Sequence, residues 1–226
     1  MPIKPTLLIA AHGTASAIGS ATTAALVAAV AVARPEVTVS VCFLDVASPR
    51  LADALLAHPE PTVVVPLLLS SGFHVLTDIP AVVARHPAVR VARHLGPDPL
   101  VVSAVIDRLA SARGPVAVAT TVLVAAGSSN PAAALDSGRA ADLLAEQLGR
   151  PVPVLTMADD LAAALGAVEP PVEVATYLLT EGKFIDNLRA SAQIVGATVS
   201  DPLGVHPALV ALVLARYDEA LVADGP

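Results

Sequence analysis

The same series of motifs occurs twice along the 226 residues, and this repeat limits the possible folds more than any other feature. Each half opens on an apolar run that ends in a small turn. It continues through a Leu-Leu pair shortly before a glycine and reaches a Leu-Gly step ahead of its last helical stretch. The matching segments are 8–14 with 123–128, 68–72 with 178–182, and 95–99 with 203–207. We therefore predict two similar domains, residues 1–114 and residues 115–226.

Short β-branched runs alternate with longer stretches rich in alanine and leucine in both halves. The predicted strands are 6–11, 37–43, 62–68, 89–92, 121–126, 152–157, 172–178 and 198–200. The predicted helices include 20–33, 48–57, 78–85, 98–112 and 207–221, of which two begin at Ser48-Pro49 and Asp98-Pro99. This pattern predicts an α/β fold in which each domain is a parallel sheet of about four strands flanked by helices.

The charge of the chain is acidic overall and unevenly divided between the halves. The net charge is −7 and aromatic residues make up 2% of the chain, which together argue against a nucleic-acid-binding protein. The first half has 8 basic and 7 acidic residues, whereas the second has 5 basic and 13 acidic residues. We interpret the acidic second half as a solubility feature that does not prevent the first half from binding an anionic ligand.

Signals for export, membrane insertion or disulfide formation are weak. The N-terminal segment has one basic residue and two prolines before the first apolar run, which makes a poor signal peptide. The uncharged windows 13–33 and 114–135 contain Thr, Ser, Gly, Asn or Pro at several positions, which disfavours a membrane span. The single cysteine, Cys42, lies in an apolar run and is expected to be buried. We expect a cytoplasmic protein with no membrane contact.

Two histidines and one carboxylate follow three successive predicted strands of the first half. His12 follows the first strand, Asp45 the second and His74 the third. In a parallel sheet the carboxyl ends of the strands share one edge, where ligands usually bind. Two imidazoles and a carboxylate suit a divalent first-row metal, and they suit general-base catalysis equally well. The spacing alone leaves both interpretations open.

The other four histidines are weaker candidates. His58 and His86 each precede a proline at the end of a predicted helix, where their charge complements the helix dipole. His94 could line a cleft near the site. His206 stands where the first half has the helix-capping residue Asp98, and we expect it to act as a substitute cap.

Four ordered motifs in residues 6–113 resemble the sirohydrochlorin chelatases of the CbiX and SirB type, which are small class II tetrapyrrole chelatases. The matching segments are 8–14, 43–49, 64–80 and 95–100. The block Pro-Leu-Leu-Leu, His and Asp-Ile-Pro within 66–80 is the most diagnostic of them. The second half resembles the degenerate C-terminal domain of the two-domain members, so the resemblance implies two chelatase-like domains with the macrocycle in the cleft between them.

The resemblance assigns metal binding to His12 and His74. The family has a glutamate at the position of Asp45, whose side chain is one methylene shorter, so we expect Asp45 to act through water or to orient a histidine. The second half has Ala126 opposite His12 and Lys183-Phe184 near the position of His74. That half is therefore expected to serve as a cleft wall and structural partner.

The expected activity is ATP-independent insertion of Fe²⁺ into sirohydrochlorin, with the metal as substrate and no prosthetic group. Cobalt insertion for cobalamin synthesis is the nearest alternative, followed by a non-catalytic tetrapyrrole or metal carrier and by an unrelated two-domain binding protein. We expect a monomer or a homodimer. The residues expected to bind the macrocycle or its carboxylates are Ser70, Ser71, Gly72, Arg50 and Arg85.

Overall fold

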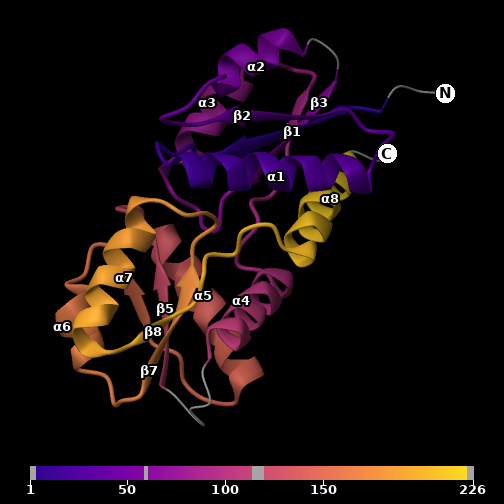
Figure 1. Cartoon of the computed structure of the whole chain (residues 1–226). Helices are drawn as coiled ribbons and strands as arrows, with labels where there is room; N and C mark the ends of the chain where they lie inside the picture. Colours follow the sequence, from indigo (N-terminus) through magenta and orange to yellow (C-terminus); the bar gives the residue numbers. More distant parts are fainter. Residues whose placement is uncertain (1–3, 59–60, 114–119, 223–226) are drawn as a thin grey trace.

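The chain folds into two four-stranded parallel sheets, one from each half of the sequence (Figure 1). The computed structural model describes residues 4–58, 61–113 and 120–222. The strand order is β2-β1-β3-β4 in the first sheet and β6-β5-β7-β8 in the second. The predicted α/β class with two similar sheets is therefore confirmed. The predicted domain boundary after residue 114 lies outside the described residues.

The two halves present their elements in the same order. The first half contains β1 (Thr6–Ala11), α1 (Ala17–Ala33), β2 (Val39–Phe43), α2 (Leu51–Ala57), β3 (Thr62–Leu67), the π-helical turn η1 (His74–Asp78), α3 (Ile79–Val83), β4 (Val89–Val91) and α4 (Pro99–Ala112). The second contains β5 (Thr120–Ala125), α5 (Pro131–Leu148), β6 (Val154–Thr156), α6 (Leu161–Gly166), β7 (Val172–Tyr177), α7 (Lys183–Val195), β8 (Thr198–Val199) and α8 (Pro207–Val222). None of the described helices is long and apolar enough to cross a membrane.

The central strands β1 and β3 are continuous apolar runs because helices cover both of their faces. All six residues of each strand are buried, and the two strands pair in parallel from Thr6 opposite Thr62 to Ala11 opposite Leu67. One face packs on α1 and α8, and the other packs on α2 and α3. Cys42 lies in the second of these cores, where burial raises the pKa of its thiol to about 12. The expected burial of Cys42 is confirmed.

The two predicted Xaa-Pro helix starts have different outcomes. Asp98 caps α4 as expected, because its side chain accepts a hydrogen bond from the Leu100 N–H at 2.9 Å. The prediction that a helix begins at Ser48-Pro49 is wrong, since α2 begins at Leu51. Pro49 instead extends alongside the end of β2, and its carbonyl accepts the Phe43 N–H at 2.9 Å. Pairing with the strand therefore takes precedence over the local helix signal.

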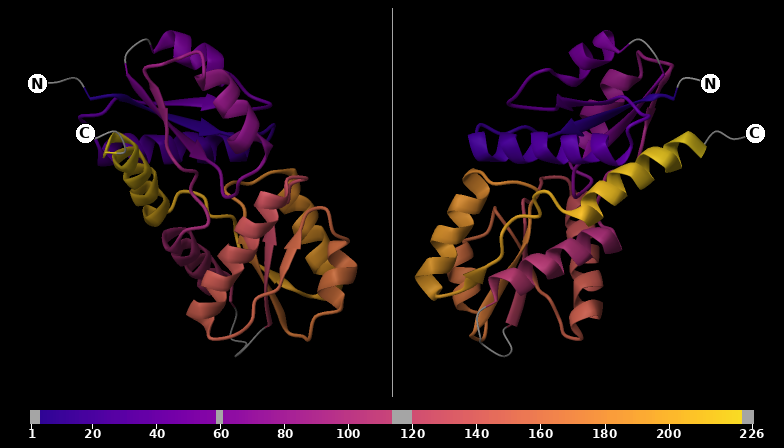
Figure 2. Two further views of the ribbon diagram at one scale, coloured as in Figure 1. Left: turned by 180° about the vertical axis from the view of Figure 1, so that it is seen from behind. Right: turned by 45° about the vertical axis from the view of Figure 1, so that its right-hand side comes forward.

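The last helix of each half packs on the sheet of the other half. α8 contacts β3 and α1 of the first half, whereas α4 contacts β7 of the second. Figure 1 and both views of Figure 2 show α8 running up beside the first sheet while α4 lies with the second. One continuous buried cluster, which includes Leu26, Leu95, Leu203 and Tyr217, joins the two sheets through these helices. The two sheets consequently share part of their core.

Glu173 in β7 is a buried carboxylate whose contribution to stability depends on pH. Its side chain is 3% exposed, and it accepts hydrogen bonds from Arg113 and Thr121 and a further bond from Arg150 at 2.9 Å. Burial alone would raise the pKa of Glu173, but these hydrogen bonds and the two positive charges outweigh burial and lower it. The stabilisation is therefore complete above the unfolded-state pKa of about 4.3 and is lost as the pH falls through the lower folded-state pKa.

We expect Glu173→Gln to lower the free energy of unfolding by about 2 kcal/mol at pH 7, because it weakens charged hydrogen bonds in a buried position. The difference from wild type should shrink below about pH 4, where the wild-type carboxyl also becomes neutral. Urea unfolding between pH 3 and pH 7 measures this difference. Glu146→Gln, at an exposed position on α5, is the control and should show no such trend. A difference that stays constant over this range would contradict the assignment.

Candidate active site

The two histidines predicted from the sequence lie side by side at one edge of the first sheet. His12 directly follows β1, and His74 begins η1 after the loop that leaves β3. β1 and β3 are hydrogen-bonded neighbours, and the chain crosses from β2 on one side of β1 to β3 on the other. Such a change of direction forms a crevice outside the strand ends. The ring centroids of His12 and His74 are 4.9 Å apart with their planes at 78°.

Each ring has its Nδ1 atom beside a hydrogen-bond acceptor. Nδ1 of His12 is 3.0 Å from the carbonyl oxygen of Gly13, and Nδ1 of His74 is 2.6 Å from an Asp78 carboxylate oxygen. An oxygen acceptor requires the proton on Nδ1, which leaves Nε2 of the neutral ring with a free lone pair. Both rings can therefore offer Nε2 to a metal ion or a proton.

The contact between His74 and Asp78 depends on a wide helical turn. The Ile79 N–H donates to the His74 carbonyl, five residues earlier, which makes η1 a single π-helical turn. Turns of this kind often occur at functional sites. The carboxylate of Asp78 fixes the orientation of the His74 ring, as carboxylates do for metal-binding histidines in general. Sequence reasoning quoted Asp78 only as part of a motif, although its spacing of four residues from His74 was a usable signal.

Asp45 lies next to the main chain of His12 without joining the two rings in a metal site. Its N–H donates to the His12 carbonyl at 2.8 Å, and a Cβ at Gly13, where φ is +95°, would overlap the Asp45 carbonyl. In the part of the chain that the structure describes, no group of three or more His, Cys, Asp or Glu side chains is arranged to hold a metal ion. The pair of histidines is therefore a candidate site that offers two ring nitrogens.

The carboxylate of Asp45 is held by its own loop. The Val46 N–H donates to it at 2.8 Å and Arg50 approaches it at 3.3 Å, so the pKa of Asp45 lies below its usual value. Val46 has φ of +65°, which is rare for a β-branched residue and costs about 1–3 kcal/mol. This strained turn keeps an ionised Asp45 at the rim of the site.

Some of the remaining predicted site residues lie in the loop before His74, and others are bonded to groups outside the histidine pair. Ser70, Ser71 and Gly72 form the loop that leads into η1. The N–H and the hydroxyl of Ser71 already have partners. The N–H donates to Asp136 at 2.7 Å, and Oγ lies 2.9 Å from Nε2 of His94. Arg50 donates to the Leu44 carbonyl and to Asp45, and its side chain is 46% exposed.

Arg85 lies away from the histidines. It follows α3, which runs back across the sheet from η1 to β4. The first residue of β4, Val89, pairs with Thr62, the first residue of β3, so this segment reaches the opposite edge of the sheet. Arg85 is a candidate because it is close in sequence to the His74 loop, but α3 lies between that loop and Arg85. We no longer include Arg85 in the site.

Comparison with known proteins agrees with this arrangement. Residues 6–112 match the CbiX family model. No curated protein sequence matches the chain. Among solved structures, SirB from Bacillus subtilis subspecies spizizenii in complex with cobalt has 23% identity and a TM-score of 0.84 over 98% of this chain and 97% of that one. SirB from Bacillus subtilis with Fe³⁺ has 24% identity and a TM-score of 0.82 over 98% of each chain.

A structure described as CbiX, the terminal enzyme for siroheme biosynthesis in denitrifying bacteria, is similar at 22% identity. Its TM-score is 0.73 over 95% of this chain and 99% of that one. The whole chain thus has the two-sheet fold of the sirohydrochlorin chelatases. Its first half matches the CbiX family model over residues 6–112. The resemblance to this family that the motifs predicted is confirmed.

Proposed function

We propose that the protein is a sirohydrochlorin ferrochelatase, which inserts Fe²⁺ into sirohydrochlorin and forms sirohaem without ATP. The observation that carries this proposal is the pair of rings of His12 and His74, 4.9 Å apart, within the half that matches the CbiX family model. The metal is a substrate that passes through the site. A pair of neutral imidazoles suits this use, because it holds a borderline metal more weakly than several thiolates would.

Insertion exchanges two pyrrole N–H protons for one divalent cation. Nε2 of each histidine is the atom that can ligate the incoming metal or accept a proton at neutral pH. As the macrocycle takes the metal, each of the two N–H pyrrole nitrogens loses its proton to a histidine or to water. Asp45 contributes negative charge near His12, which favours the approach of a cation.

The rim of the site suits a large, flat and acidic substrate. Val46, Phe73 and Leu76 are exposed apolar side chains in the segments that carry Asp45 and His74. They offer an apolar surface to a macrocycle, and the exposed guanidinium of Arg50 is available to a substrate carboxylate. Ser70 and Gly72 remain our proposed lining residues, whereas Ser71 is assigned a different role below.

Cobalt insertion is the second candidate, because the similar SirB structures contain cobalt in one case and Fe³⁺ in the other. Two histidines and a nearby carboxylate accept either divalent metal. The test is an anaerobic absorbance assay with sirohydrochlorin and equal concentrations of Fe²⁺ or Co²⁺, with and without protein. Faster insertion of Fe²⁺ supports the proposal, and faster insertion of Co²⁺ supports a cobaltochelatase. Rates no higher than those in buffer would indicate a non-catalytic carrier.

Asp78 should affect the reaction through His74. We expect Asp78→Ala to lower kcat/KM for Fe²⁺ by about 10–100-fold, because the ring of His74 loses the partner that fixes its tautomer and orientation. Asp78→Asn keeps an oxygen acceptor and should lose less. Steady-state insertion rates measure both effects, with Asp53→Ala at an exposed position on α2 as the control. Equal rates for Asp78→Ala and wild type would remove Asp78 from the site.

We propose that the protein works in the cytoplasm as a monomer or a homodimer and needs no prosthetic group. These properties stay predictions from the sequence.

A further inference from the structure

A polar cluster joins the loop before His74 to the second half of the chain. The carboxylate of Asp136, on α5, accepts the N–H of Ser71 at 2.7 Å and lies 3.9 Å from Nε2 of His94. The hydroxyl of Ser71 completes the cluster through its 2.9 Å contact with His94. The side chains of His94 and Asp136 are 17% and 20% exposed, so the cluster is largely shielded from water.

The carboxylate of Asp136 makes its polar contacts with Ser71 and His94 of this cluster. In the part of the chain that the structure describes, it pairs with no arginine or lysine. A second contact from the same half reaches Leu69, two residues before Ser71, because the hydroxyl of Tyr177 donates to the Leu69 carbonyl at 3.4 Å. The second half therefore contacts this segment at two main-chain groups, the Leu69 carbonyl and the Ser71 N–H.

The held segment leads directly to the site. Gly72 follows Ser71, and its carbonyl accepts the Leu76 N–H at 3.2 Å in the first turn that presents His74. A shift of Ser71 would therefore shift the start of η1 and the ring of His74 with it. The metal site depends on geometry at this scale, because displacements of about 1 Å can greatly reduce a rate.

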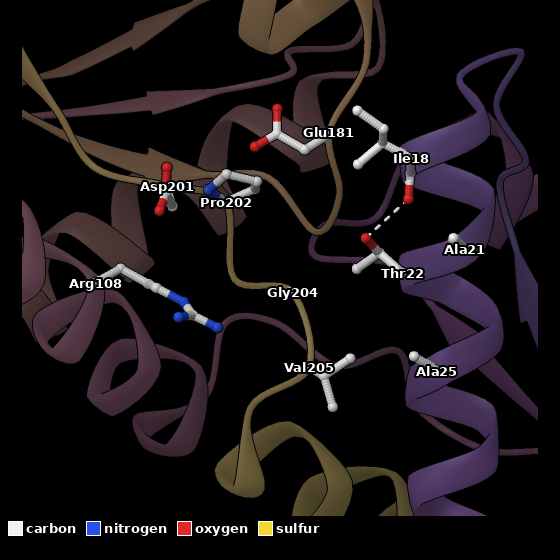
Figure 3. Close-up of a pocket in the computed structure, with 10 residues that line it drawn as sticks. All are labelled: Ile18, Ala21, Thr22, Ala25, Arg108, Glu181, Asp201, Pro202, Gly204 and Val205. Carbon is white, nitrogen blue, oxygen red and sulfur yellow. Dashed lines mark hydrogen bonds between the residues drawn. The ribbon is translucent and has the colours of Figure 1, made fainter.

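The internal repeat provides a comparison within the same molecule. The repeat matches Asp136 to Thr22 on α1 and Ser71 to Glu181, in the loop of the half that lacks the site histidines. Thr22 bonds to Ile18 of its own helix, and Glu181 pairs with Arg189. An open pocket of about 410 Å³ lies between these elements. Figure 3 shows Thr22 and Glu181 among the residues that line it. No hydrogen bond joins α1 to that loop among the described residues.

We propose that Asp136 is a positioning residue for the proposed chelatase reaction, which holds the loop of residues 70–73 so that His74 faces His12. The inference rests on the proposed function and gives the second half of the chain a part in it. Asp136 acts through Ser71 and does not touch the metal or the macrocycle. Among the described residues, this hydrogen-bonded cluster lies beside the loop that carries a site histidine and has no counterpart beside the matching loop.

The test compares Asp136→Ala and Asp136→Asn with two controls, Thr22→Ala at the matching position and Asp142→Asn at an exposed position of α5. Three properties are measured: hydrogen exchange of the Ser71 amide by NMR, Co²⁺ affinity from its visible absorption, and kcat/KM for Fe²⁺ insertion. In Asp136→Ala we expect about tenfold faster exchange, weaker Co²⁺ binding and about a tenfold lower kcat/KM. Asp136→Asn keeps an oxygen acceptor and should remain within about threefold of wild type. The controls should match wild type.

Two results would overturn the inference. One is unchanged exchange of the Ser71 amide in Asp136→Ala, and the other is faster exchange with unchanged Co²⁺ affinity. Asp136→Ser is too short to reach Ser71 and carries the same expectations if the alanine variant does not fold. A wild-type protein that binds Co²⁺ but inserts no metal would refute the proposed function, while exchange and Co²⁺ affinity would still decide the role of Asp136.

Discussion

Replacing His12 or His74 by alanine should lower kcat/KM for Fe²⁺ insertion by at least about 100-fold, the largest effect expected in this chain. Each substitution removes one of two nitrogen ligands and one of two proton acceptors. The double variant should be little worse than either single variant, because residues that act as a unit do not contribute additively. The fold should survive, since His12 is exposed and His74 is half-buried.

Anaerobic insertion assays and urea unfolding measure these two outcomes on the same preparations. His86→Ala is the matched control, because His86 follows α3 on the segment that leads away from the site. Wild-type rates in the double variant would exclude the histidine pair from catalysis. Loss of folding in the single variants would assign the pair a structural role.

The second large effect concerns the stability of the fold, in which α8 packs on the sheet of the first half. Arg216 on α8 has a side chain that is 3% exposed, and it donates to the His94 carbonyl at 3.2 Å and to Asp98 at 2.7 Å. We expect Arg216→Met to lower the free energy of unfolding by about 3–4 kcal/mol, because Oδ2 of Asp98 and the His94 carbonyl lose their arginine donor. Methionine keeps much of the volume, so the loss reports on these bonds.

The repeat supplies the control for this prediction. Arg108 on α4 is the counterpart of Arg216 and donates to the Leu203 carbonyl at 2.7 Å, but it has no carboxylate partner among the described residues. His206 stands where Asp98 would be, and it caps α8 as expected by accepting the Ala208 N–H at 3.2 Å. Arg108→Met should therefore cost only about 1–2 kcal/mol in urea unfolding. An equal or larger loss for Arg108→Met would contradict this account.

The sequence predicts most of the fold because strand burial and helix capping are local signals. The continuous apolar run 6–11 is β1, and Asp98-Pro99 starts α4. The helix predicted over 78–85 in fact begins earlier, at His74, and ends at Val83. The exchange of α4 and α8 between the sheets had no local signal, since it depends on contacts between distant segments.

The site also combines features that have a local sequence signal with features that depend on distant contacts. His12 and His74 are predictable because parallel strands end at one edge of a sheet. Arg85 follows α3, which carries the chain away from the histidines towards the other edge of the sheet, so we leave it out of the proposed site. The contact between Asp136 and Ser71 joins residues 65 positions apart across the two halves, so no spacing rule reveals it.

The central claim is that His12 and His74 together receive the metal. The most direct measurement is an anomalous difference map from crystals soaked in Co²⁺ at the cobalt absorption edge. The account predicts one peak within bonding distance of Nε2 of both histidines, which is about 2.0–2.2 Å for first-row metals. A peak in the second half of the chain, or a peak bound to only one of the two rings, would contradict it.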